Sequence, residues 1–111
     1  PAHGAAVVYT IMSDPALKAE WELEVTAMRD RINDLRAKLV AKLAASGVSK
    51  DFSFIQDQRG MFSYSGLTLE QVRKLRSEYA IYIADTGRMS IAGVSDNNID
   101  YLCESIKKVV G

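Results

Sequence analysis

The chain has 111 residues, of which 48% are hydrophobic and 25% charged, as in an ordinary globular domain. Fourteen Lys and Arg residues balance fourteen Asp and Glu residues, which argues against a nucleic-acid or anionic-membrane binder because such proteins carry an excess of basic charge. No apolar run approaches the roughly eighteen residues of a membrane span. A single cysteine, Cys103, has no partner for an internal disulfide, so we expect a reducing compartment such as the cytoplasm.

The chain begins with Pro-Ala-His-Gly, without an initiator methionine, a basic start or an apolar signal segment. We therefore expect it to be processed or to be a piece of a longer protein. Residues 4–12 are small and apolar, and their pattern fits a buried helix turn and a strand equally well.

A long helix is predicted over residues 13–46. Ser13 is a candidate N-cap, Asp14 and Pro15 suit a first turn, and Gly47 suits the C-terminal end. Apolar residues recur every three or four positions, which is typical of one helix face. They are Leu17, Trp21, Val25, Met28, Ile32, Leu35, Leu39 and Leu43.

This helix is long for the size of the chain. Thirty residues give a helix of roughly 45 Å, whereas a compact domain of this size has a radius of gyration of about 13 Å. We therefore expect it to reach a partner or a structure outside this chain. Its charged residues are typical of a solvated face: Glu24, Arg29, Asp30, Arg36 and Lys42.

After Gly47 the pattern changes to short segments of alternating polarity. Residues 51–56 and 61–66 predict two strands joined by a tight connection at residues 57–60. Residues 80–84 and 88–94 are the next strand candidates.

Two shorter helices are predicted around these strands. Thr68 and Gln71 have the spacing of a capping box, and Leu67 and Val72 that of a hydrophobic staple. The last helix is expected to begin near Ser95 and to present one apolar stripe: Ile99, Leu102, Ile106 and Val109. The order of elements predicts an α/β fold, with a few strands covered by helices.

The chain offers few residues for catalysis. His3, the only histidine, has no ligand at metal-binding spacing, so no metal site is predicted. Cys103 is expected to be a small buried thiol, and Ser63 and Ser65 have no histidine to activate them. The glycines form no phosphate-binding pattern. We therefore predict no catalytic residue in this chain.

Arg88 is the residue most suggestive of a ligand. Strand alternation places Arg88 and Ser90 on one face and Met89 and Ile91 on the buried face. Gly87 permits a tight turn and a close approach by a ligand. A guanidinium at this position can bind a carboxylate through two parallel hydrogen bonds, or can simply be a solvated arginine at the end of a strand.

Residues 51–106 closely resemble the C-terminal region of the aspartate and aromatic aminotransferases, which are class I, fold-type I enzymes dependent on pyridoxal phosphate. The motifs QRGMFSYSGL and TGRMSIAG carry the resemblance, and PAHGAAVV and AEWELEVTAMRDRI are similar to the preceding segment of that family. The resemblance covers the whole chain without a large gap.

The resemblance implies two substrate-binding residues. The arginine of the family's SGR motif, which binds the substrate α-carboxylate, corresponds to Arg88, and the phenylalanine of GMF, which lines the same pocket, corresponds to Phe62. This chain has Thr86 where the family usually has serine, which is a conservative change.

The resemblance also implies a division of the chain. Residues 1–12 would form the edge of a large cofactor-binding domain, residues 13–46 the interdomain helix, and residues 47–111 the small C-terminal domain. The lysine that bonds to pyridoxal phosphate and the other cofactor-binding residues would lie upstream of Pro1, so the 111 residues alone are expected to be inactive.

The implied enzyme is a homodimer, cytoplasmic or mitochondrial, that transfers an amino group from aspartate or an aromatic amino acid to a 2-oxo acid such as 2-oxoglutarate. No nucleic-acid or membrane partner is implied.

Two alternatives are an independent α/β module that senses amino acids through Arg88, and a helical interaction module built on the stripe from Leu17 to Leu43. The first predicts saturable amino-acid binding by the isolated chain, and the second predicts concentration-dependent helicity.

Overall fold

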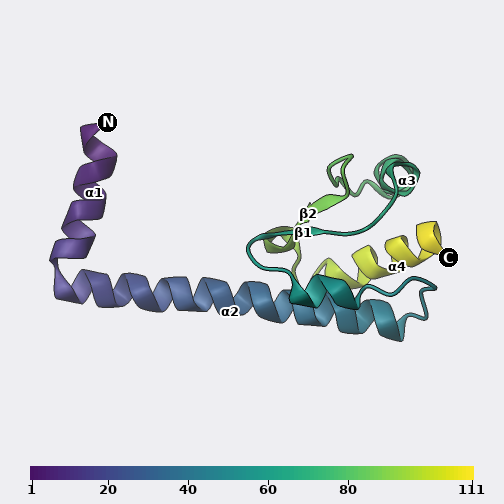
Figure 1. The fold of residues 1–111 in the computed structure, drawn as a ribbon, viewed down its shortest axis with the longest axis horizontal. Helices are drawn as coiled ribbons and strands as arrows, with labels where there is room; N and C mark the ends of the chain where they lie inside the picture. The colour runs from purple at the N-terminus through teal and green to yellow at the C-terminus, as the bar shows by residue number, and fades with distance from the viewer. The chain divides into compact units, whose positions relative to one another are not determined.

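The computed structural model describes all residues from 1 to 111 and contains four α-helices, two short 3₁₀ helices and one two-stranded sheet (Figure 1). In chain order these are α1 (Ala2–Ser13), α2 (Pro15–Ala45), η1 (Ser53–Asp57), β1 (Phe62–Tyr64), α3 (Leu69–Tyr79), β2 (Arg88–Ser90), η2 (Ile91–Gly93) and α4 (Ile99–Val110). The chain divides into two compact units, Pro1–Arg31 and Ile32–Gly111. None of its helices is both long and apolar enough to cross a membrane.

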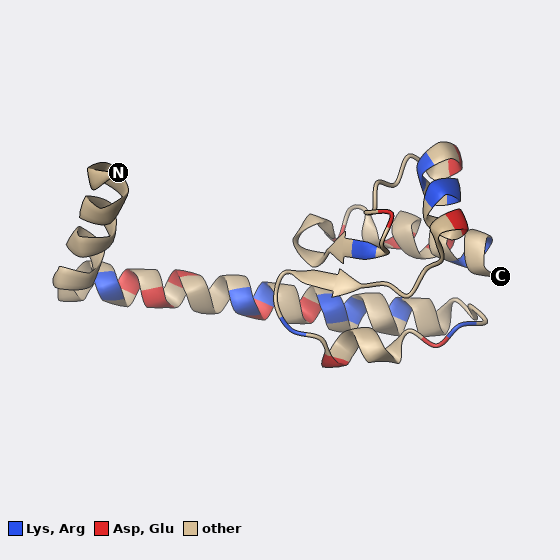
Figure 2. Cartoon of the chain, turned by 45° about the horizontal axis from the view of Figure 1, so that its top comes forward, with Lys and Arg blue, Asp and Glu red and all other residues tan.

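The first unit consists of α1 and the beginning of α2. Helix α1 contains no Lys, Arg, Asp or Glu (Figure 2) and has no buried residue. The predicted N-cap at Ser13 is wrong, because Ser13 is already the last residue of α1. Asp14 caps α2 instead: its Oδ1 accepts hydrogen bonds from the backbone N–H groups of Ala16 at 2.8 Å and Leu17 at 3.2 Å.

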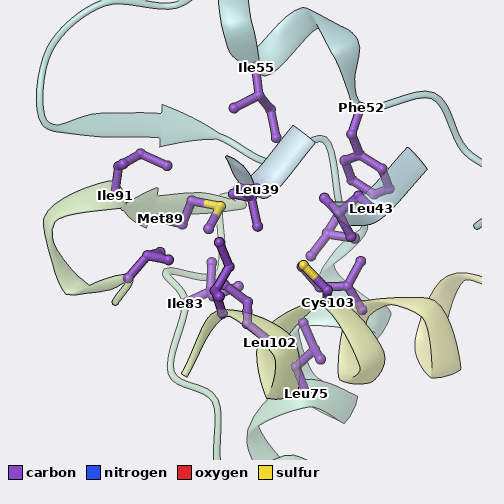
Figure 3. Close-up of a cluster of buried hydrophobic side chains, with 14 of the residues drawn as sticks. Leu39, Leu43, Phe52, Ile55, Leu75, Ile83, Met89, Ile91, Leu102 and Cys103 are labelled. Carbon is purple, nitrogen blue, oxygen red and sulfur yellow. The ribbon is translucent and has the colours of Figure 1, made fainter. Parts of the chain in front are cut away.

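The predicted long helix is confirmed as α2, which has 31 residues. Its buried side chains all lie near its C-terminal end, at Leu35, Arg36, Leu39 and Leu43. The three leucines belong to the core of the second unit. Figure 3 shows Leu39 and Leu43 among apolar residues from the loops, β2, α3 and α4.

The predicted strand at residues 51–56 is wrong, and so is the hairpin built on it, because this segment forms η1. Asp51 accepts hydrogen bonds from the backbone N–H and the hydroxyl of Ser53, which turns the chain instead of extending it. Phe52 and Ile55 are the buried residues of this segment, so its true apolar spacing is three and not two.

Strand β1 lies within the predicted segment 61–66, but its partner is β2 and not the preceding segment. The two strands are antiparallel, with Phe62 opposite Ser90, Ser63 opposite Met89, and Tyr64 opposite Arg88. On the other edge of β1, the side-chain amide of Gln58 accepts from the backbone N–H of Tyr64 and donates to its carbonyl. This pairing leaves β1 with hydrogen-bonding partners on both sides.

Residues 80–84 were expected to form a strand and do not. Ala80 adopts a left-handed conformation that ends α3, and the backbone N–H of Ile81 bonds to the Leu75 carbonyl. A tight turn then joins the Ala84 carbonyl to the N–H of Gly87, and leads directly into β2. Ile83 is buried, as an inward-facing strand residue would be, but it does not belong to the sheet.

The predicted capping box of α3 is confirmed. The Thr68 hydroxyl accepts from the backbone N–H of Gln71, and the Gln71 side chain accepts from the N–H of Thr68. Leu67 and Val72, the two residues of the predicted staple, are both buried.

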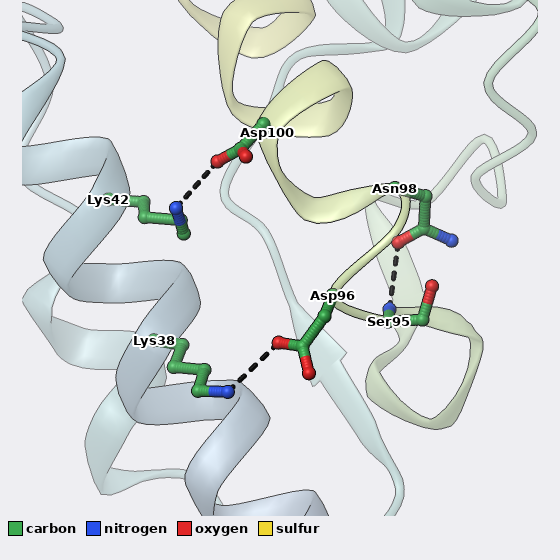
Figure 4. A network of polar contacts seen from close by, with 6 residues as sticks. All are labelled: Lys38, Lys42, Ser95, Asp96, Asn98 and Asp100. Atoms are coloured by element: carbon green, nitrogen blue, oxygen red, sulfur yellow. Dashed lines mark hydrogen bonds and ion pairs between the residues drawn. The ribbon is translucent and has the colours of Figure 1, made fainter.

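Helix α4 begins at Ile99, four residues later than expected, because residues 95–98 form a turn held by the bond from the Ser95 N–H to Asn98 Oδ1 (Figure 4). Of its predicted stripe, Ile99, Leu102 and Ile106 are buried and Val109 is partly buried.

Two ion pairs join α2 to the beginning of α4. Lys38 lies 2.9 Å from Asp96 and Lys42 lies 2.6 Å from Asp100, one helical turn apart on α2 (Figure 4). All four side chains are largely exposed, so each pair adds little stability compared with the buried leucines beneath them.

We expect Thr68→Ala to lower the free energy of unfolding by about 1 kcal/mol, because the backbone N–H of Gln71 loses the hydroxyl that accepts its hydrogen bond. Urea unfolding monitored by circular dichroism measures this change. Thr26→Ala, in the middle of α2, is the matched control. It should leave the free energy of unfolding unchanged or raise it slightly, since alanine favours helices. Equal losses for the two variants would contradict a capping role for Thr68.

We expect Gly87→Ala to lower the free energy of unfolding by about 1–3 kcal/mol, because Gly87 has a φ of +83° that a side chain disfavours. Gly93→Ala is the control: Gly93 has an ordinary φ and open space around it, so the same added methyl should change stability little. A Gly87→Ala variant as stable as Gly93→Ala would contradict the geometry of this turn.

Candidate functional site

The candidate site is the exposed face of the two-stranded sheet. Because side chains alternate along a strand, Ser63 and Met89 point into the core while Phe62, Tyr64 and Arg88 point outward. The predicted burial of Met89 and the predicted exposure of Arg88 are both confirmed. The two residues expected to bind substrate, Phe62 and Arg88, therefore lie on one face.

Arg88 and Phe62 are in direct contact. The guanidinium carbon of Arg88 lies 4.9 Å from the centre of the Phe62 ring, within the range of a cation–π interaction. Such a contact at an exposed site is worth about 0.5–1 kcal/mol, enough to favour one orientation of a long side chain. This contact involves the charge of the guanidinium and not a hydrogen bond from its N–H groups.

Other arginines use those N–H groups within the chain. An oxygen atom of the chain accepts from, or pairs with, the guanidinium of Arg29, Arg36, Arg59, Arg73 and Arg76. Arg88 makes no such hydrogen bond or ion pair, so its full donor set faces solvent. This arrangement can accept a carboxylate through two parallel N–H···O bonds.

Gly87 has the tight turn that the sequence predicts. The close approach at this glycine, however, is made by the chain itself: an added Cβ would lie 3.3 Å from the Leu67 carbonyl oxygen, Ser65 Oγ and Tyr64 Cε2. Ser65 also stabilises the turn, since its backbone N–H and its hydroxyl both donate to the Gly87 carbonyl, at 2.9 and 2.7 Å. Gly87 therefore fixes where β2, and with it Arg88, begins.

The predicted position of Arg36 is wrong. It was expected on a solvated face, but its side chain is buried, with 2% of its surface exposed. Burial, with a smaller contribution from the positive charge of Arg59, lowers the pKa of Arg36. The spacing contained a signal: Arg36 follows Ile32 by four residues and precedes Leu39 by three, which is the spacing of the apolar stripe.

The remaining candidates for chemistry have structural roles. Cys103 is buried beside α2, and burial raises the pKa of its thiol to about 11, so it carries almost no thiolate at neutral pH. Ser63 accepts from Arg36, and Ser65 donates to Gly87. His3 lies exposed on α1, and no group of three potential metal ligands occurs in the chain.

No lysine lies on the sheet face that carries Arg88. Four lysine side chains end instead on the carboxylates of Asp96 and Asp100 or on the carbonyl oxygens of Gly66 and Ser46. The residues of this sheet face therefore fit a carboxylate, and not a cofactor that must bond to a lysine.

The model of the family "Aminotransferase class I and II" matches residues 1–106. The aspartate aminotransferase of Haemophilus influenzae is 52% identical over 108 residues, which cover 97% of this chain and 27% of that protein.

Two solved structures are also similar to this chain, both in sequence and in fold. A mitochondrial aspartate aminotransferase from Trypanosoma brucei superposes with a TM-score of 0.96 at 43% identity, covering 100% of this chain and 29% of that one. An aromatic-amino-acid aminotransferase from Burkholderia pseudomallei, covalently bound to pyridoxal phosphate, gives 0.96 at 47% identity, with 100% and 28% covered. The chain thus spans a little over a quarter of the length of its relatives. Its sequence and its fold both show that it belongs to the class I and II aminotransferase family.

Proposed function

We propose that this chain is the C-terminal part of a pyridoxal-phosphate-dependent aminotransferase acting on aspartate or an aromatic amino acid, and that Arg88 binds the α-carboxylate of its substrate. The observation that carries the proposal is that the Arg88 guanidinium lies over the Phe62 ring and has no acidic partner in the chain. Two relatives with nearly the same fold are named as aminotransferases for these two kinds of substrate.

The role of Arg88 is to bind and to orient. Two N–H···O bonds fix both the position and the plane of a carboxylate, whereas a lysine would fix only a distance. The contact with the Phe62 ring favours one orientation of the Arg88 side chain. Holding the substrate in this way lowers the entropy cost of reaching the reactive geometry.

The cofactor and the reacting groups belong, in this proposal, to the part of the enzyme that precedes residue 1. Residues 1–12 form the edge of the large domain, residues 13–46 the interdomain helix and residues 47–111 the small domain. The exposed apolar side chains of the first unit support this division, since exposed patches of this kind mark interaction surfaces. They include Val7, Val8, Tyr9, Met12, Leu17, Trp21, Val25 and Met28.

The proposed co-substrate is a 2-oxo acid such as 2-oxoglutarate, and the proposed assembly is a homodimer. A small domain that carries the carboxylate-binding arginine can close on its substrate, which would couple recognition to the exclusion of water. We propose a reducing compartment, the cytoplasm or the mitochondrion, because Cys103 is a free thiol.

We expect Arg88→Ala, in the complete enzyme, to lower kcat/KM for aspartate by about 30- to 5,000-fold, because a charge-assisted pair with the substrate is lost. This factor corresponds to a loss of about 2–5 kcal/mol of transition-state stabilisation. Steady-state kinetics measure this effect. Arg73→Ala is the matched control, since Arg73 only faces Asp85 across 3.8 Å in an exposed pair. A kcat/KM for Arg88→Ala that equals that of Arg73→Ala would remove Arg88 from the substrate site.

We expect the natural gene product to have a mass several times 12.2 kDa and a visible absorbance band of bound pyridoxal phosphate, because the relatives are more than three times as long as this chain. Mass spectrometry and an absorbance spectrum of the purified protein test both points. A natural product of 12.2 kDa without that band would contradict the proposal and favour an independent amino-acid-binding module.

A further inference from the structure

Arg36 is a buried cation without an acidic partner. Proteins normally bury a charge only when it is paired or fully hydrogen-bonded, because the loss of hydration is costly. Its side chain is 2% exposed, no carboxylate contacts it, and Nη1 is buried without any hydrogen-bond partner. A leucine or methionine would fill this part of α2 at lower cost, so the contacts that Arg36 does make require an explanation.

Those contacts lie on both sides of Phe62. Nη2 of Arg36 donates to the Gly60 carbonyl at 2.6 Å and to Ser63 Oγ at 3.1 Å, and Nε donates to the same hydroxyl at 3.3 Å. Gly60 precedes Phe62 by two residues and Ser63 follows it directly. Arg36 therefore holds the segment that carries the Phe62 ring at two points, from the core side of the strand.

The same segment is connected to Arg88. Ser63 lies opposite Met89 in the sheet, and the N–H of Ile91 donates to the Met61 carbonyl at 2.9 Å. Phe62 in turn lies against the Arg88 guanidinium. A shift of residues 60–63 would therefore change both the ring and the strand that position the carboxylate-binding group.

We propose that Arg36 is a positioning residue for substrate recognition: it ties residues 60–63 to helix α2 and so sets the Phe62–Arg88 pair at the geometry that receives the substrate carboxylate. The inference rests on the proposed function of Arg88. The guanidinium is suited to this role because its planar fork reaches two acceptors at once, whereas a lysine reaches them with one flexible ammonium group. If α2 is the interdomain helix, Arg36 also makes this pair move with that helix.

The test uses the complete enzyme with Arg36→Met, Arg36→Lys and Ser63→Ala. We expect Arg36→Met to raise KM for aspartate, and the Kd for a non-reacting dicarboxylate such as succinate, by about tenfold or more, since small displacements at a binding group have effects of this size. Arg36→Lys should give an intermediate rise and Ser63→Ala a smaller one, with kcat changed less than KM in all three. Steady-state kinetics and titration calorimetry provide the two measurements.

Lys38→Met is the matched control, because Lys38 lies two residues further along α2 and makes only an exposed ion pair with Asp96. It should leave KM and Kd unchanged. A purely structural role for Arg36 predicts a different outcome, in which the melting temperature and the active fraction fall while KM and Kd stay at the wild-type values. That outcome overturns the inference. If Arg36→Met does not fold, unchanged KM and Kd in both Arg36→Lys and Ser63→Ala overturn it as well.

Failure of the inference can be told apart from failure of the proposed function. If the wild-type enzyme transfers amino groups and Arg88→Ala impairs it, while the Arg36 and Ser63 variants keep their KM and Kd, only the role of Arg36 is refuted. If the wild-type enzyme does not transfer amino groups, or Arg88→Ala has no effect, the proposed function is refuted and the role of Arg36 with it.

Discussion

The antiparallel pairing of β1 with β2 is the constraint on which the candidate site depends. Three residues of each strand pair, and this short ladder alone brings Phe62 next to Arg88 although they are far apart in the sequence. The ladder has one buried face and one exposed face, so Met89 anchors the same strand that presents Arg88. The stability of the core and the geometry of the exposed guanidinium are therefore consequences of one alignment.

The two arginines on opposite sides of this sheet illustrate different uses of one side chain. Arg88 is exposed, rests on a ring and has its donors free. Arg36 is buried and donates hydrogen bonds to Gly60 and Ser63, while its Nη1 has no hydrogen-bond partner. Buried polar groups of this kind cost stability and can gain specificity of arrangement in return. In this fold the arrangement in question is that of β1, whose outer face forms half of the candidate site.

Local patterns in the sequence predict much of this structure. Apolar spacing predicts α2, residue types at fixed offsets predict the capping box at Thr68, and alternation predicts the opposite faces of Arg88 and Met89. These features are local, and each is determined by neighbours within about one helical turn or one strand. The substrate role of Arg88, in contrast, was suggested by family resemblance, since composition and spacing are equally compatible with a solvated arginine.

What the sequence does not predict depends on distant parts of the chain. The alternation of Phe52 and Phe54 suggests a strand, but the side chain of Asp51 and the packing of Ile55 produce a 3₁₀ turn. The partner of β1 is about two dozen residues away, beyond the reach of any local pattern. The burial of Arg36 depends on two acceptors in that same distant segment, so its charge suggests solvent exposure when the sequence is considered alone.

The alignment of the two strands also determines which insertions and deletions evolution can accept here. Helix α3 and its flanking loops begin and end at Ser65 and Gly87, which are bonded to each other, so the intervening loops can change length without moving β2. A single residue inserted between Gly87 and Arg88 would instead shift the register by one position. Because the side-chain period of a strand is two, that shift would turn Arg88 toward the core and Met89 toward solvent. Length variation among related proteins should therefore occur around α3 and be absent from β2.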